Sequence, residues 1–110
     1  MSAIEPRSGE KRILQEDCAE DKLKNGILTL TNQRLIFEKT EGRMVVLSKK
    51  IGEVVLDVPL DKISSVKAEG FLLKKVTIVV DQKQYKFGVF NNSEWAKSIL
   101  KQQYDNKIRY

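Results

Sequence analysis

Apolar and polar side chains alternate with a period of two along most of the chain, which is typical of half-buried β-strands. Residues 27–31 and 34–39 each place two large apolar side chains on one face, and Asn32 and Gln33 form a short turn between them. This spacing predicts a β-hairpin. The same alternation predicts four further strands and, more weakly, an opening strand, which cover residues 54–60, 64–69, 74–80, 84–90 and 12–17.

The alternation also predicts which strand side chains face the core. Pro59 has no N–H to give to a neighbouring strand, so its strand ends there or lies at an edge. The expected inward positions are Leu28, Leu30, Leu35, Phe37, Val54, Leu56, Val58, Leu60, Val66, Ala68, Val76, Ile78, Val80, Tyr85, Phe87 and Val89.

The period changes to that of a helix after residue 90. Residues 91–94 read Asn-Asn-Ser-Glu, an N-cap residue with Glu three positions later, which is a capping-box pattern. We expect the helix to end near Tyr104, with residues 105–110 either fraying or extending it. Its expected apolar face comprises Trp95, Ala96, Ile99, Leu100 and Gln103.

Seven short strands followed by one amphipathic helix predict a mainly β fold. A seven-stranded antiparallel unit leaves two open ends or edges, and a terminal helix that carries the only Trp can cover one of them. We therefore expect a curved sandwich or partly open barrel capped by a C-terminal helix. No repeat or linker divides the chain, so we expect one domain over residues 11–104, after a flexible leader (1–10) and before a C-terminal tail (105–110).

Composition argues against catalysis. The 110 residues carry a net charge of +5 and include no His and one Cys. Without His the chain lacks the usual general base near neutral pH and the commonest metal ligand. Cys18 lies among four acidic residues that raise the pKa of its thiol and make it a poor nucleophile. We expect no enzyme activity, metal, cofactor or small-molecule substrate.

The sequence shows no sign of export or membrane insertion. The first twelve residues contain no apolar signal-peptide core. The longest apolar run, Met44–Leu47, is far shorter than the ~20 residues of a spanning helix. A single Cys suits a reducing compartment. We expect a cytoplasmic protein that can also lie at the periphery of a membrane.

Several landmarks occur in a recognisable order. Residues 26–37 read Gly-Ile-Leu-Thr-Leu-Thr-Asn-Gln-Arg-Leu-Ile-Phe, and residues 58–66 read Val-Pro-Leu-Asp-Lys-Ile-Ser-Ser-Val before the Trp95-bearing helix. Over about residues 10–104 the chain resembles GRAM domains and related small pleckstrin-homology-like (PH-like) domains, most of all stand-alone microbial members. We expect these motif residues to be structural: Gly26 would start a strand at positive φ, and Arg34 would satisfy loop carbonyls or pair with an acid.

The resemblance implies a binding module, and some members of the family bind phosphoinositides or acidic lipids through loops at the open end of the barrel. The expected first loop, residues 16–25, carries four acids and only two Lys, which disfavours an anionic headgroup there. The expected third-to-fourth loop, residues 40–53, is either another buried strand or an apolar segment that dips into a membrane. Its candidate lipid-binding residues are Lys49 and Lys50.

Strand parity gathers a second set of cations on the outward face of the second sheet. Lys67, Lys75 and Lys86 should lie near one another, with Lys74 at a strand end. Stacked like charges repel across strands, so an anionic partner would relieve a cost, as would the nearby Glu69 and Asp81. This is a candidate anion- or lipid-binding surface, and a solvated face is the alternative.

Residues 70–75, between two expected strands, place Phe71, Leu72 and Leu73 in a hairpin connection. Loop tips are normally polar, so these side chains either fold back over the barrel end or contact a partner. Our first interpretation is a non-catalytic binding module for a protein partner or for self-association. Peripheral binding to anionic lipids is the alternative. Nucleic acid is disfavoured because no outward aromatic row offers a stacking platform.

Overall fold

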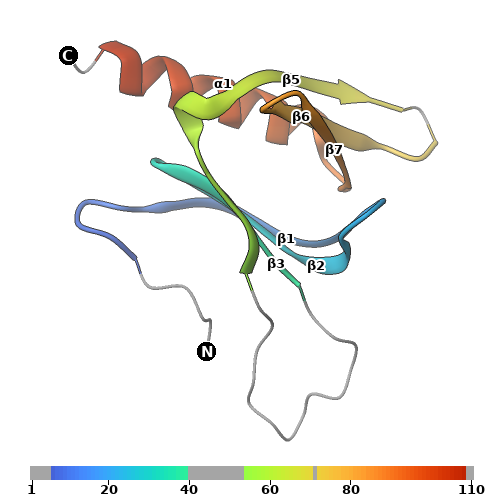
Figure 1. Cartoon of the computed structure of the whole chain (residues 1–110). Coiled ribbons are helices and arrows are strands. Elements are labelled where there is room, and N and C mark those ends of the chain that lie inside the picture. The colour runs from blue at the N-terminus through green and yellow to red at the C-terminus, as the bar shows by residue number, and fades with distance from the viewer. Residues whose placement is uncertain (1–5, 40–53, 71, 109–110) are drawn as a thin grey trace, which may run out of the picture.

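The computed structural model describes residues 6–39, 54–70 and 72–108, and it confirms the expected mainly β fold (Figure 1). Within these ranges seven antiparallel strands form one open sheet in the order β4-β3-β2-β1-β7-β6-β5, and one helix follows them. The elements are β1 (Arg12–Glu20), β2 (Lys24–Thr31), β3 (Arg34–Lys39), β4 (Val54–Pro59), a 3₁₀ turn η1 (Leu60–Lys62), β5 (Ile63–Glu69), β6 (Lys75–Val80), β7 (Lys83–Gly88) and α1 (Asn92–Ile108).

The sheet folds over on itself into two layers, as Figure 1 shows. Strands β1 to β4 form one layer and β5 to β7 the other, and the layers are joined where Ala19 pairs with Gly88 and Glu20 with Phe87. The outermost strands, β4 and β5, do not pair with each other, so the barrel stays open on that side. Helix α1 packs against β5, β6 and η1.

The core lies between the layers and under the helix. Phe37 from β3 and Phe87 from β7 meet there with ring centroids 5.2 Å apart. Trp95 of α1 is only 2% exposed, and Ile99 one turn later is fully buried. Each large apolar side chain buried in this way contributes roughly 1.5–3 kcal/mol. The inward positions predicted for the first hairpin and for β6 are confirmed: Leu28, Leu30, Leu35, Phe37, Val76, Ile78 and Val80 are all buried.

Predictions for three individual residues of the strands are wrong. Val54 is exposed, because the β3–β4 register shifts between Phe37 and Glu38. Ala68 lies on the inward face by register but is exposed, because it belongs to an outermost strand. Strand β7 ends at Gly88, so Phe90 lies in the connection to α1, where it is 86% exposed.

The expected acidic first loop, residues 16–25, is also wrong. Strand β1 continues to Glu20 and β2 begins at Lys24, so the connection is only three residues long. Every second side chain of β1, four in all, turns away from solvent. Two of these four are the carboxylates of Glu16 and Glu20. The apolar alternation that reveals other strands therefore fades in this half of β1.

Gly26 has a different role from the expected one. It lies inside β2 rather than at the start of a strand, and its φ is not positive. A Cβ added there would lie 2.5 Å from the Glu38 carbonyl oxygen and 2.6 Å from the Phe37 ring. Glycine is therefore required by the close approach of β3 and of a core aromatic ring.

Helix α1 runs to Ile108, so residues 105–108 extend it. At its start the Asn92 side chain donates hydrogen bonds to the carbonyl oxygens of Glu69 (2.9 Å) and Lys75 (3.2 Å), which ties the helix to β5 and β6. Leu100, expected on the buried face, is 49% exposed. Across residues 6–39, 54–70 and 72–108 no helix is long and apolar enough to cross a membrane.

Candidate binding surface

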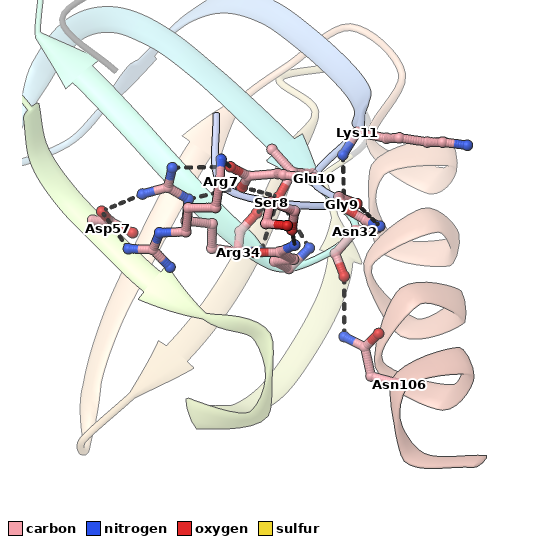
Figure 2. A network of polar contacts seen from close by, with 11 residues as sticks. Arg7, Ser8, Gly9, Glu10, Lys11, Asn32, Arg34, Asp57 and Asn106 are labelled. Atoms are coloured by element: carbon pink, nitrogen blue, oxygen red, sulfur yellow. Dashed lines mark hydrogen bonds and ion pairs between the residues drawn. The ribbon is translucent and has the colours of Figure 1, made fainter. Parts of the chain in front are cut away.

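Arg34 stands at the centre of a buried ion-pair network (Figure 2). Its Nε and Nη2 donate to the two carboxylate oxygens of Glu10 at 2.8 and 3.0 Å, and its Nη1 donates to Asp57 Oδ2 at 2.8 Å. The Glu10 and Arg34 side chains are only 3% and 6% exposed. These hydrogen bonds outweigh the opposing effect of burial and lower the pKa of Glu10 from 4.5 to about 2.

The same network ties the N-terminal segment to the β2–β3 turn and to α1. Asn32 Oδ1 accepts from the Lys11 N–H at 2.8 Å, and Asn32 Nδ2 donates to the Gly9 carbonyl at 3.1 Å. Asn106 Nδ2 donates to the Asn32 carbonyl at 3.1 Å (Figure 2). The expectation that Arg34 pairs with an acid is confirmed. Since the guanidinium and both carboxylates bind one another, this part of the motif is structural.

Two of the three carboxylates of β1, those of Glu16 and Glu20, are internal hydrogen-bond acceptors. Glu16 accepts from the Trp95 indole N–H at 2.9 Å and from the Phe90 N–H at 2.7 Å. Glu20, 3% exposed, accepts from the N–H groups of Lys22, Leu23 and Lys86 at 2.7–2.9 Å. These two acids hold the helix and the β1–β2 connection in place, so they do not form an acidic surface.

Cys18 lies between these carboxylates on β1. Burial, and then the charges of Glu16, Asp17 and Glu20, raise the pKa of its thiol to about 12. The predicted direction is confirmed, although burial is the larger cause. In the described part of the chain no group of three or more acidic or Cys side chains is placed to hold a metal ion.

The second layer carries the expected cations on its outward face. Lys67 of β5 lies opposite Thr77 of β6, which lies opposite Lys86 of β7. Lys75 is on the same face of β6, and its Nζ lies 3.3 Å from Asp21 Oδ1. We call Lys67, Lys75 and Lys86 the lysine row.

Other cations and acids complete the charge pattern around this row. Glu69 accepts from the Thr77 hydroxyl at 2.8 Å, so acid is present beside the row. Lys74 is exposed just before β6. The other two candidate cations, Lys49 and Lys50, lie outside the described residues.

The connection between β5 and β6 presents two bare apolar side chains. Leu72 is 86% exposed and Leu73 is 77% exposed, so the alternative in which they fold back over the barrel is wrong. Phe71 lies outside the described residues. Gly70 has φ +94°, and a Cβ there would collide with the Leu73 carbonyl, so glycine shapes this connection. We call Leu72 and Leu73 the apolar tip.

Phe90 is a further exposed apolar side chain, in the connection between β7 and α1. Lys75 pairs with Gly88 at the end of the β6–β7 ladder, and Leu73 and Phe90 each lie two residues beyond that pair. With Val89 inward, the period-two pattern already turns Phe90 outward, and the end of β7 at Gly88 places it in the connection to α1. This signal marks Phe90 as exposed but does not connect it with Leu72 and Leu73.

A groove at the opposite end of β5 was not anticipated. It has a volume of about 900 Å³ and lies between η1, the start of β5 and the second half of α1. Buried Leu60 and Ile63 form its floor, and Leu100 and the 62% exposed Tyr104 form its wall. Gln103 fixes this arrangement by donating to the Leu60 and Ile63 carbonyls at 2.8 and 3.0 Å. We call it the helix groove.

Comparisons with known proteins agree with this architecture. The family model described as "Bacterial PH domain" matches residues 10–102. No curated protein matches the chain. Eight chains of solved structures match, among them the Vps36 N-terminal PH domain, with a TM-score of 0.69 and 16% identity over 94% of this chain and 86% of that one. At this identity the likeness shows a shared fold.

Proposed function

Because the chain belongs to the bacterial PH domain family, we propose that it is a non-catalytic binding module that joins a protein surface through its apolar tip. PH-like domains typically bind lipids or proteins. The observation that carries the proposal is the exposure of Leu72 and Leu73 on a short connection. Within the family, residues 26–37 keep their resemblance to GRAM domains, and we propose that relationship as well.

The energetics of the apolar tip favour a partner. Covering an exposed Leu side chain contributes roughly 1.5–3 kcal/mol when its burial is complete. Gly70, at φ +94°, permits the turn that presents the tip. Phe90, in the connection from β7 to α1, is a further exposed apolar side chain.

The double variant Leu72→Ser/Leu73→Ser tests this function. In affinity capture from lysate, proteins held by the wild type should be lost by the variant while its circular dichroism spectrum stays unchanged. Ile13→Ser is the matched control, because Ile13 is an exposed apolar side chain on β1, outside the β5–β6 connection. Equal capture of every protein by the wild type and the double variant would rule out the tip as the binding surface.

A second candidate function is peripheral binding to an anionic membrane. It is favoured by Lys74 next to the apolar tip and by the lysine row on the adjoining strands, since each Lys near an anionic surface contributes about 1 kcal/mol. Co-sedimentation with phosphatidylserine-containing vesicles and with neutral phosphatidylcholine vesicles tests it. Binding should require the anionic lipid and weaken with salt. Equal sedimentation with both vesicle types contradicts it.

A further inference from the structure

Strand β5 offers backbone groups to a further strand. It is the last strand of the sheet, and no described residue pairs with its outer edge. Natural edge strands are usually blocked by proline, charge or irregularity. The other outermost strand, β4, ends in Pro59, whereas β5 contains no proline and pairs regularly with β6 from Ser65 to Glu69. An added strand therefore meets fewer obstacles at β5.

The charges of β5 are complementary to a second β5. We propose that two copies of this chain pair antiparallel through β5, with a two-fold axis at Ala68; the inference rests on the proposed protein-binding function and names its partner. In such an isologous contact, residues equally far from the axis face each other. Lys67 of each copy then faces Glu69 of the other, so opposite charges meet twice.

Neighbouring registers lack this match. An axis at Lys67 brings two lysines face to face, and an axis at Val66 sets Lys67 opposite Ser65. Ala68 has the smallest side chain of β5 and is exposed, so it allows close approach at the axis. The observed charges therefore select one register.

The same register brings the apolar tip of one copy to the groove end of the other. The tip follows Glu69 at the end of β5, and antiparallel pairing places that end alongside the start of the other copy's β5, at Ile63. Ile63 lines the helix groove, whose wall includes the half-exposed Leu100 and Tyr104. Each exposed apolar tip is therefore directed toward the end of the other copy that carries the groove, and the two-fold axis repeats this arrangement.

Charge reversal tests the pairing. Light scattering of the wild-type chain from micromolar to millimolar concentration should show twice the monomer mass. Lys67→Glu alone and Glu69→Lys alone each place like charges opposite each other, and each should weaken the dimer by about tenfold or more. An equimolar mixture of the two variants restores both attractive pairs in a heterodimer, so its mass should return to that of a dimer.

The matched control is Lys22→Glu, which makes the same charge change in the β1–β2 connection and should leave the mass unchanged. A monomeric wild type, an unweakened Lys67→Glu variant, or a mixture that stays monomeric would each overturn the β5 dimer. None of these results bears on capture of another protein by Leu72 and Leu73. The proposed function fails separately, when the tip variant captures every protein that the wild type does.

Discussion

Replacing Glu10 with Gln removes the anionic half of the buried pair with Arg34 and changes the side-chain shape little. The drop in the Glu10 pKa from 4.5 to about 2 spans about 2.5 pH units, which corresponds to about 3 kcal/mol. Asp57 remains beside the guanidinium and is 36% exposed, so it and nearby water offset part of the loss. We expect Glu10→Gln to lower the free energy of unfolding by about 2 kcal/mol at pH 7.

The pH dependence gives the stricter test. Because the pKa of Glu10 is lower in the folded state, its stabilisation is fully present above about pH 4.5 and disappears as the pH falls toward 2. Urea unfolding followed by Trp95 fluorescence should therefore show a gap between wild type and Glu10→Gln that falls to less than half by pH 3. The exposed Glu94→Gln is the control and should change stability little. A gap that is the same at pH 7 and pH 3 would refute the reasoning.

Three further predictions concern the interior. Gly26→Ala forces a Cβ against β3 and should destabilise the fold by about 2 kcal/mol in urea unfolding; a loss below about 0.5 kcal/mol contradicts the close approach. Trp95→Phe removes the indole N–H that donates to Glu16 and should lower the free energy of unfolding by about 2 kcal/mol, measured by urea unfolding followed by circular dichroism. An unchanged unfolding midpoint would mean that this hydrogen bond is dispensable. Cys18 should react with a thiol reagent at pH 8 far more slowly in the folded than in the urea-unfolded chain, and equal rates would contradict its raised pKa.

The sequence predicted the parts of the fold that rest on local apolar alternation. Strands β2, β3 and β6 emerged this way, because side chains such as Leu28 and Val76 repeat every second residue and are buried. Glu16 and Glu20 were misread as loop residues because they occupy inward positions of β1. Their donors, which include the Trp95 indole and the Lys86 N–H, lie far away in the sequence. No local sequence pattern indicates a hydrogen bond between residues so far apart in the chain.

The candidate surface was predicted unevenly for the same reason. The outward parity of Lys67 and Lys86 follows from strand alternation alone, and the register places them in one row as expected. The exposure of Leu72 depends on whether a tip folds back or projects, which only the three-dimensional packing decides. The helix groove joins η1 to the second half of α1, and such a contact between distant segments has no periodic signature.

The pairing of β1 with β7 joins segments from nearly opposite ends of the chain, and this bears on how the protein is made. A ribosome releases β1 to β4 first, so this half-sheet waits with the edge of β1 unpaired until the last strand emerges. During that interval Glu16 and Glu20, later satisfied by N–H groups of residues 86–95, are free to stay hydrated and charged. We expect their charges to keep nascent chains from pairing edge to edge. Once β7 and the helix have formed, the same carboxylates accept their N–H groups.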